Sequence, residues 1–281
     1  MKKSLKHLPK NKQEELQKVV MAIQTTCKDV EKIILFGSYA RGDYKEKKDL
    51  KPQQKTGHIS DYDILVVTEK KETTDEFVSW NGAENLNLSA PARIIAHDIE
   101  SLNINLAEGQ YLYTDIKKEG ILLFDAKKHK LASKRKLKRS EKQRIAKDYF
   151  EHWFERSESF SKHYGYAMLD KDYKTAAFNL HQAAEHAYKT ILLVFTNYNP
   201  NEHYLRILGK MSEKHCEDIK NLFPKTTQKE KDRFKLLEYA YIGGRYDPDY
   251  RISKEDLEIL AKDVNKLLEA TKKVCQKKIN I

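Results

Sequence analysis

The chain lacks the features of several protein classes. Its 281 residues include only 10 glycines and 6 prolines, and 40% are hydrophobic, which excludes collagen-like, low-complexity and wholly disordered chains. No apolar run approaches the roughly 18 residues of a membrane span, so no membrane association is expected. The basic N-terminus also lacks the apolar stretch of a signal peptide. The three cysteines, Cys27, Cys216 and Cys275, have no zinc-site spacing and are typical of reduced thiols in a cytoplasmic protein.

Positive charge is the most evident property of the composition. Lysine and arginine number 53 against 42 acidic residues, which gives a formal net charge of +11. A basic chain favours anionic partners such as nucleotides, RNA or acidic surfaces. Many of the cations lie between residues 127 and 147, and this segment predicts a solvated linker, an RNA-contacting strip, or both.

The first half of the chain mixes helical and strand patterns. Apolar residues recur at helical spacing over residues 11–28, and 98–109 and 111–118 also read as helices. Four short runs rich in β-branched residues, bounded by turn formers, predict strands at 33–36, 64–67, 93–97 and 121–124. This order predicts an α/β (α+β) domain with a small mixed sheet.

The second half shows helical patterns only. Helices are expected over 145–164, 176–192, 203–222, 227–243 and 254–276, with Pro200, Pro224 and Pro248 between them as helix breakers. This half predicts an all-α helical bundle. We therefore expect two domains, 1–130 and 131–281.

Two motifs in the first half carry chemistry. The strand at 33–36 ends in Gly37-Ser38, where backbone N–H groups and a hydroxyl can contact a triphosphate, and Gly37 permits close approach. Asp61 and Asp63 are two positions apart at the start of the next strand, so both carboxylates leave the same face. Neighbouring carboxylates repel unless a cation lies between them, which is the arrangement for Mg²⁺ bridging nucleotide phosphates.

With Gly37-Ser38, Arg41-Gly42 and Ser60-Asp61-Tyr62-Asp63, residues 10–125 resemble the nucleotidyltransferase superfamily of DNA polymerase beta, especially its minimal prokaryotic members. The resemblance implies that Gly37, Ser38 and Arg41 contact the nucleotide, while Asp61 and Asp63 hold Mg²⁺ (or Mn²⁺) and carry catalysis. The reaction would transfer a nucleoside monophosphate from a nucleoside triphosphate to a hydroxyl of a protein, an RNA or a small molecule. Two metal ions would stabilise the attacking and leaving oxygens.

The chain departs from this family pattern in two places. Residues 45–58 form a lysine-rich insertion, which predicts a charged loop or a substrate-facing flap. The third carboxylate that the family supplies from a later strand is not evident, and His97 and Asp98 (or Glu100) are the tentative substitutes. The alternative function is therefore a catalytically impaired module that binds nucleotide and acts on RNA or a protein partner.

The second half carries Leu-His-Gln-Ala-Ala-Glu, which contains His181 and Glu185, and later Ala-Tyr-Ile-Gly-Gly-Arg-Tyr, which contains Arg245. With these segments, residues 140–278 resemble the HEPN domain. Ribonuclease members have a histidine four to six residues after the arginine, whereas Tyr250 stands in that place here. A phenol cannot replace imidazole in proton transfer near neutral pH. The resemblance therefore implies a non-cleaving domain, an anion or nucleotide site at Arg245, Tyr250, His181 and Glu185, and a homodimer.

Overall fold

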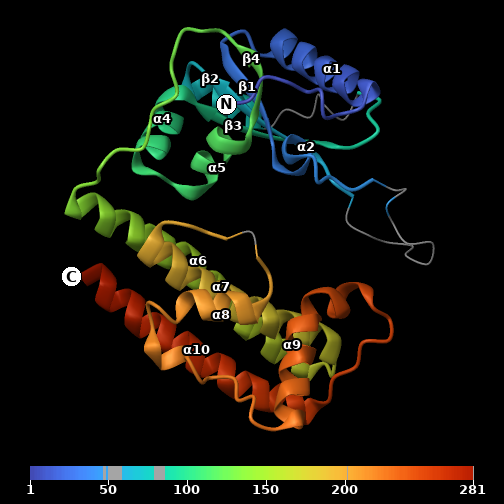
Figure 1. Ribbon diagram of the computed structural model, residues 1–281, viewed down its shortest axis with the longest axis vertical. Coiled ribbons are helices and arrows are strands. Elements are labelled where there is room, and N and C mark those ends of the chain that lie inside the picture. The colour runs from blue at the N-terminus through green and yellow to red at the C-terminus, as the bar shows by residue number, and fades with distance from the viewer. Residues whose placement is uncertain (47–48, 50–58, 79–85, 201, 281) are drawn as a thin grey trace. The chain divides into compact units, whose positions relative to one another are not determined.

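The computed structural model describes residues 1–46, 49, 59–78, 86–200 and 202–280. The chain forms two compact units, Met1–Lys136 and Leu137–Ile281 (Figure 1). Most of the lysine-rich insertion expected at 45–58 lies outside the described residues. Among the helices that the structure describes, none is long and apolar enough to cross a membrane.

The N-terminal unit is built on a four-stranded mixed sheet of order β3-β2-β1-β4. Its strands are β1 (Val30–Phe36), β2 (Tyr62–Thr68), β3 (Ala92–Asp98) and β4 (Ile121–Asp125). β1 pairs antiparallel with β2 and β4, whereas β2 pairs parallel with β3. The parallel pair needs a crossover connection, and this contains α3 (Lys71–Val78), which the sequence patterns did not predict. The small mixed sheet expected from the sequence is confirmed.

Helices cover both faces of this sheet. On one face α1 (Lys10–Thr26) packs Leu16 and Ile23 against alternate residues of β1 and β2. On the other face α4 (Ile99–Glu108) and α5 (Tyr111–Glu119) cover a second cluster that includes Leu65 of β2. β2 is central and covered on both faces, which explains its continuous apolar sequence.

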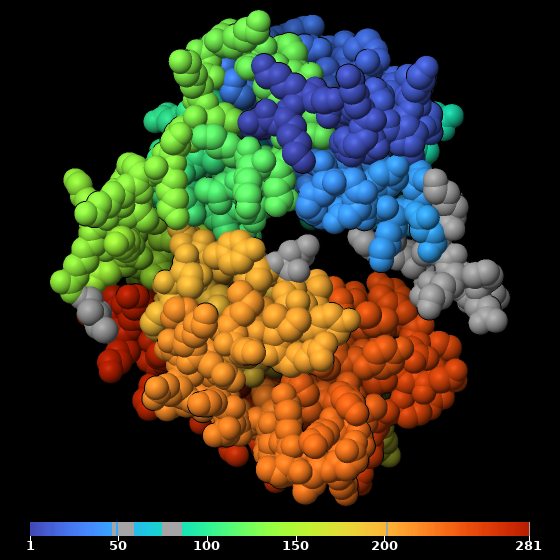
Figure 2. All heavy atoms as spheres, in the orientation of Figure 1, coloured from blue at the N-terminus to red at the C-terminus, as the bar shows by residue number. Residues whose placement is uncertain are grey.

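A short helix and an extended segment complete the N-terminal unit. α2 (Gly37–Arg41) follows β1 directly. After β4, residues 126–136 run without helix or strand over the surface of the unit (Figure 2). This segment is held to α4 by hydrogen bonds from Ala132 to Asn103 and from Arg135 to the Ala107 carbonyl. Part of the basic strip therefore lies on the N-terminal unit.

The C-terminal unit is helical, as the sequence predicts. Its elements are α6 (Arg139–Leu169), α7 (Tyr173–Thr196), α8 (Leu205–Ser212), a 3₁₀ turn (Glu217–Ile219), α9 (Gln228–Tyr246) and α10 (Lys254–Asn280). α7 lies at the centre and packs against α6, α8, α9 and α10. The single helix expected over 203–222 is wrong. α8 ends at Ser212, whose buried hydroxyl bonds the Tyr188 carbonyl, and the chain then turns.

Candidate functional site

The glycine turn and the second aspartate of the N-terminal unit meet. β1 and β2 pair so that Phe36 lies opposite Asp63, which places Gly37 beside that carboxylate. Gly37 has φ +70°, and a Cβ built on it would lie 3.1 Å from Asp63 Cγ and would overlap Oδ2. Only glycine combines this backbone conformation with this approach. The structure therefore brings the turn at Gly37 together with Asp63, although the two residues are well separated in the sequence.

Asp61 and Asp63 flank a residue that is anchored on the opposite face of β2. The Tyr62 ring packs in the cluster under α1, where its hydroxyl donates a hydrogen bond of 2.7 Å to Glu15. Because successive side chains of a strand alternate, Asp63 lies on the α4–α5 face, with Asp61 just before the strand. Both aspartates are half-buried. Asp61 and Asp63 thus lie at the end of the sheet where β1 ends and α2 begins.

Ser38 and Arg41 lie in α2, next to this pair in the chain. The Ser38 hydroxyl has no hydrogen-bond partner among the described residues, and its carbonyl accepts the N–H groups of Gly42 and Asp43. The Arg41 guanidinium lies 3.2 Å from Asp43 and 3.6 Å from Glu119 of α5. Exposed ion pairs of this kind contribute about 1 kcal/mol or less. A polyphosphate can therefore compete for Arg41.

The structure does not bring His97 and Asp98 to the aspartate pair. In the parallel pairing of β2 with β3, Asp63 is opposite Arg93, while His97 and Asp98 are opposite Val67 and Thr68. They therefore lie at the other end of the sheet, roughly 13 Å along the strand at 3.3 Å per residue. Both have other partners there.

At that other end, each of the two residues has a structural role. His97 Nε2 lies 2.9 Å from the Tyr113 hydroxyl, and burial lowers the pKa of the imidazole. Asp98 caps α4 by accepting the Ser101 N–H at 2.8 Å. Burial alone would raise the pKa of Asp98, but the hydrogen bonds from Ser101 lower it. Neither side chain can reach a metal ion held by Asp63.

Arg93, and not His97 or Asp98, is the residue of β3 that lies next to Asp63. It is exposed and lies on the same face of the sheet as its neighbour Asp63. Within the described part of the chain, no group of three or more His, Cys, Asp or Glu residues could hold a metal ion. Sequence patterns missed Arg93 because its alignment with Asp63 depends on the strand register.

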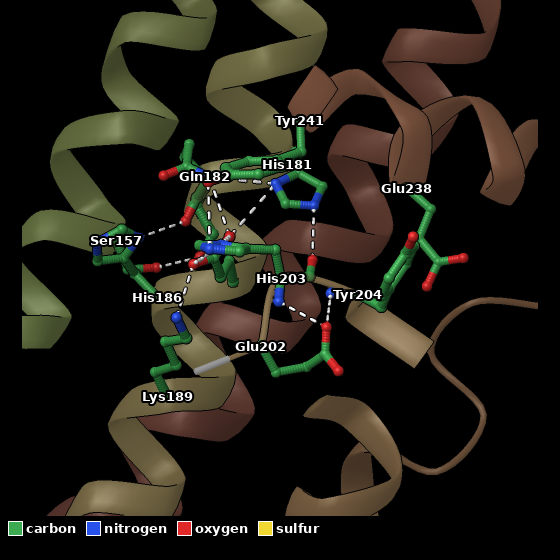
Figure 3. Close-up of polar contacts among 12 residues, drawn as sticks. Ser157, His181, Gln182, His186, Lys189, Glu202, His203, Tyr204, Glu238 and Tyr241 are labelled. Carbon is green, nitrogen blue, oxygen red and sulfur yellow. Dashed lines mark hydrogen bonds and ion pairs between the residues drawn. The ribbon is translucent and has the colours of Figure 1, made fainter. Parts of the chain in front are cut away.

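In the C-terminal unit, buried polar side chains of α7 surround Glu185, and Figure 3 shows three of them, His181, Gln182 and Lys189. Its carboxylate accepts hydrogen bonds from Lys189 at 2.9 Å, from Gln182 at 3.1 Å and from His203 Nδ1 at 3.1 Å. His203 comes from the segment before α8. No motif marked His203, because only the folded connection between α7 and α8 brings it to Glu185.

The charges of this cluster follow from its burial. Burial alone would raise the pKa of Glu185, but the hydrogen bond from His203 and the charge of Lys189 lower it to about 2. Burial lowers the pKa of His181 to about 4, so this imidazole is neutral. Its Nε2–H donates to the His203 carbonyl at 3.1 Å, and its Nδ1 accepts from Gln182 at 3.2 Å. His181 is thus a positioning residue for the segment that carries His203.

Arg245 and Tyr250 do not share a site. The Arg245 guanidinium is exposed and lies 4.3 Å from the centre of the Tyr241 ring. Tyr250 is buried, its hydroxyl donates to the Leu236 carbonyl at 2.9 Å, and burial raises the pKa of the phenol. The structure therefore separates Tyr250, as a core residue, from the group of Arg245, His181 and Glu185.

The two units correspond to two known domain classes. Residues 17–129 match the family described as polymerase beta, nucleotidyltransferase, and residues 150–274 match the HEPN domain family. No curated protein matches the chain. A solved nucleotidyltransferase-like protein from Exiguobacterium sibiricum 255-15 is 14% identical, with a TM-score of 0.37 over 95% of this chain and 75% of that protein.

The fold and the paired motifs define a nucleotidyltransferase-type fusion protein. Residues 17–129 are a polymerase beta nucleotidyltransferase domain by this match, and residues 150–274 are a HEPN domain.

Replacement of Gly37 by alanine tests the contact with Asp63. We expect Gly37→Ala to lower the free energy of unfolding by about 1–3 kcal/mol, because alanine disfavours positive φ and its Cβ displaces the carboxylate. Gly165→Ala is the control, since a Cβ at Gly165 meets nothing within 4 Å. That helix variant should be more stable by about 0.5–1 kcal/mol. If urea denaturation gave the same change in the free energy of unfolding for Gly37→Ala and Gly165→Ala, the close contact between Gly37 and Asp63 would be contradicted.

A second prediction concerns acid stability of the C-terminal unit. The folded pKa of Glu185, about 2, lies below its ordinary value of 4.5. Its stabilising contribution is therefore complete above about pH 5 and is lost as the pH falls towards 2, by about 3 kcal/mol. In Glu185→Gln this loss should disappear, while stability at pH 7 falls because Lys189 is left buried without its partner.

Thermal denaturation between pH 2 and 7 measures both effects. Glu151→Gln is the matched control, because Glu151 is exposed and pairs only loosely with Lys147 at 3.7 Å. If the melting temperatures of the wild type and of Glu185→Gln changed with pH in parallel, the lowered pKa would not belong to Glu185.

Proposed function

We propose that the protein transfers a nucleoside monophosphate from a nucleoside triphosphate to a hydroxyl acceptor in the presence of Mg²⁺ or Mn²⁺, and releases pyrophosphate. Asp61 and Asp63 would hold the ion, and Gly37, Ser38 and Arg41 would contact the phosphates. The acceptor would be a protein, an RNA or a small molecule. The polymerase beta family match supports the transferase class of this proposal.

One observation carries the proposal, namely the carboxylate of Asp63 against the backbone of Gly37. An ion held by that carboxylate would lie next to the turn that a phosphate tail would contact. Carboxylate oxygens are the ligands that hard divalent cations prefer. The half-buried pair therefore fits one Mg²⁺, whose charge would offset the repulsion between a polyphosphate and two acids.

The chain's own groups would orient the nucleotide. The Ser38 hydroxyl, without a partner among the described residues, and the backbone of the glycine turn can donate hydrogen bonds to phosphate oxygens. Arg41 would exchange its exposed ion pairs with Asp43 and Glu119 for a phosphate. Each of these contacts positions the triphosphate relative to the aspartates and does not depend on the acceptor.

The second candidate function is nucleotide binding with impaired transfer. Arg93 beside Asp63 favours it, because a guanidinium attracts phosphate oxygens but opposes a second metal ion. A two-metal reaction needs both ions. Arg93 would then retain the nucleotide in a site that transfers slowly.

We propose that the chain consists of two domains, residues 1–130 and 131–281. We also propose that the second of these domains does not cleave RNA. The core position of Tyr250 supports this, because a buried phenol with a raised pKa cannot shuttle protons for RNA cleavage. We further propose that the domain forms a homodimer and that the basic segment 127–147 contacts RNA. Sedimentation and salt-dependent RNA binding would test these two proposals.

Transfer of label from [α-³²P]-labelled ATP, CTP, GTP and UTP, together with calorimetric binding, tests the proposed reaction. We expect Asp61→Asn and Asp63→Asn each to lower transfer by about 100-fold or more, because charge stabilisation worth several kcal/mol is lost. Asp148→Asn, an exposed aspartate of α6, is the control. Saturable nucleotide binding with no transfer by the wild type would favour the second candidate.

Arg93→Asp distinguishes the two candidates further. If Arg93 limits the site to one ion, an acid at this position should raise transfer at saturating Mg²⁺ by about tenfold or more, since a second ion gains a ligand. Arg93→Ala should raise it less. A fall in transfer for both variants, with weaker binding of the triphosphate, would instead show that Arg93 serves catalysis through substrate contact.

A further inference from the structure

A groove lies at the β4 edge of the N-terminal unit, between the first residues of the chain, α1 and the edge strand β4. Its volume is about 360 Å³, within the roughly 300–1,000 Å³ of small-molecule sites. Most of its lining is apolar and comes from Leu5, Leu16, Val20, Met21, Leu122 and Leu123. The described residues that line it include no acid and no residue of the proposed transfer site.

The N-terminal segment is held against β4 and forms one wall of the groove. The Lys2 N–H donates to the Gly120 carbonyl at 3.2 Å, and the Lys2 carbonyl accepts the Leu122 N–H at 2.9 Å. A turn closed by the Leu8 N–H and the Leu5 carbonyl, at 2.9 Å, then leads into α1, which forms another wall. Backbone hydrogen bonds therefore fix both walls, and the groove is preformed.

An irregularity in β4 shapes the floor of the groove. Ile33 of β1 pairs with Phe124, whereas its neighbour Ile34 pairs with Leu122, so Leu123 is one residue more than β1 has at this point. Such a bulge reorients the side chains around it. The consecutive residues Leu122 and Leu123 both line the groove for this reason, although a regular strand would direct them to opposite faces.

The groove leaves apolar side chains in contact with water. Leu16 is fully buried, but Leu5, Val20 and Leu123 are only half-buried, and Met21 is 59% exposed. An apolar chain that displaced water from them would bind with a free energy proportional to the area that it covers. Met21 can adapt its shape to such a chain, because its side chain is unbranched and has three rotatable bonds.

Two polar side chains, Lys3 and Gln17, also line the groove, and both can donate to an anion. Both are exposed, and among the described residues Lys3 forms no ion pair and the Gln17 amide no hydrogen bond. The hydrogen bond from Lys32 lowers the pKa of Asp125, and the charge of Lys3 lowers it further. Because Asp125 is already bonded to Lys32 at 2.6 Å, the Lys3 ammonium is available to another carboxylate.

We propose that this groove binds a free fatty acid of medium chain length. The alkyl chain lies against Leu16, Val20 and Leu123, and the carboxylate contacts the Lys3 ammonium and the Gln17 amide. An apolar lining without an acid does not attract a cationic amphiphile, whereas the lysine favours an ionised carboxylate over an alcohol of the same length. The site does not depend on nucleotidyl transfer.

Calorimetric titration of the full-length protein with decanoate, below the concentration at which it forms micelles, tests the site. We expect one decanoate per chain and an affinity that rises about three- to fourfold per methylene from octanoate to decanoate. Lys3→Met should weaken decanoate binding by about tenfold or more, through loss of a charge-assisted hydrogen bond, and leave binding of 1-octanol unchanged. Val20→Trp, which fills the groove, should abolish binding of both.

Lys6→Met is the matched control, because Lys6 is exposed in the same segment and does not line the groove. It should bind decanoate like the wild type, and thermal denaturation checks that each variant folds. Equal affinities of Lys3→Met and Lys6→Met, no saturable binding, or uptake of several decanoates per chain would overturn the proposal. So would a dimer in sedimentation that Val20→Trp dissociates and decanoate leaves intact, because a second copy of the chain would then fill the groove.

Discussion

The contact between Asp63 and Gly37 is the constraint on which the N-terminal chemistry depends. The antiparallel register of β1 and β2 sets it, because Phe36 faces Asp63 and the chain then turns through a positive φ. A shift of one residue in this register would move Asp63 to the α1 face, away from the turn. The core packing of Tyr62 under α1 opposes such a shift. Sheet register, the turn and the position of the Asp63 carboxylate are thus fixed by one arrangement.

The charge next to Asp63 determines how many cations this arrangement can accept. Two carboxylates alone bind one divalent ion well, and a third acid would create room for a second. Arg93 places a positive charge there instead, which under the proposed function would favour a polyphosphate over another metal ion. In the proposed function, nucleotide binding and nucleotidyl transfer would therefore differ by the charge of this one side chain and not by the fold.

Local sequence patterns predicted the strands and helices and the residues at their ends. They did not predict which residues of different elements lie side by side, because strand register and the connections between elements determine that. Gly37, Asp61 and Asp63 could be placed from the sequence because each stands at the end of a recognisable strand. His97 and Asp98 were chosen as polar residues of the right strand, but the crossover containing α3 sets the offset that aligns Arg93 with Asp63. Tyr250 was chosen by its spacing from Arg245, yet its ring packs in the core after α9 ends.

In the C-terminal unit, a core ion pair determines a surface position. Glu185 and Lys189 are both buried, and such a pair persists only when its members neutralise each other and bond fully. The second oxygen of Glu185 still accepts His203, so the orientation of a half-exposed imidazole depends on a carboxylate inside α7. Because α7 also carries His181, which holds the backbone of His203, this one helix contacts both the ring and the backbone of the residue. The domain can therefore lack a histidine after Arg245 and still present one near the same arginine.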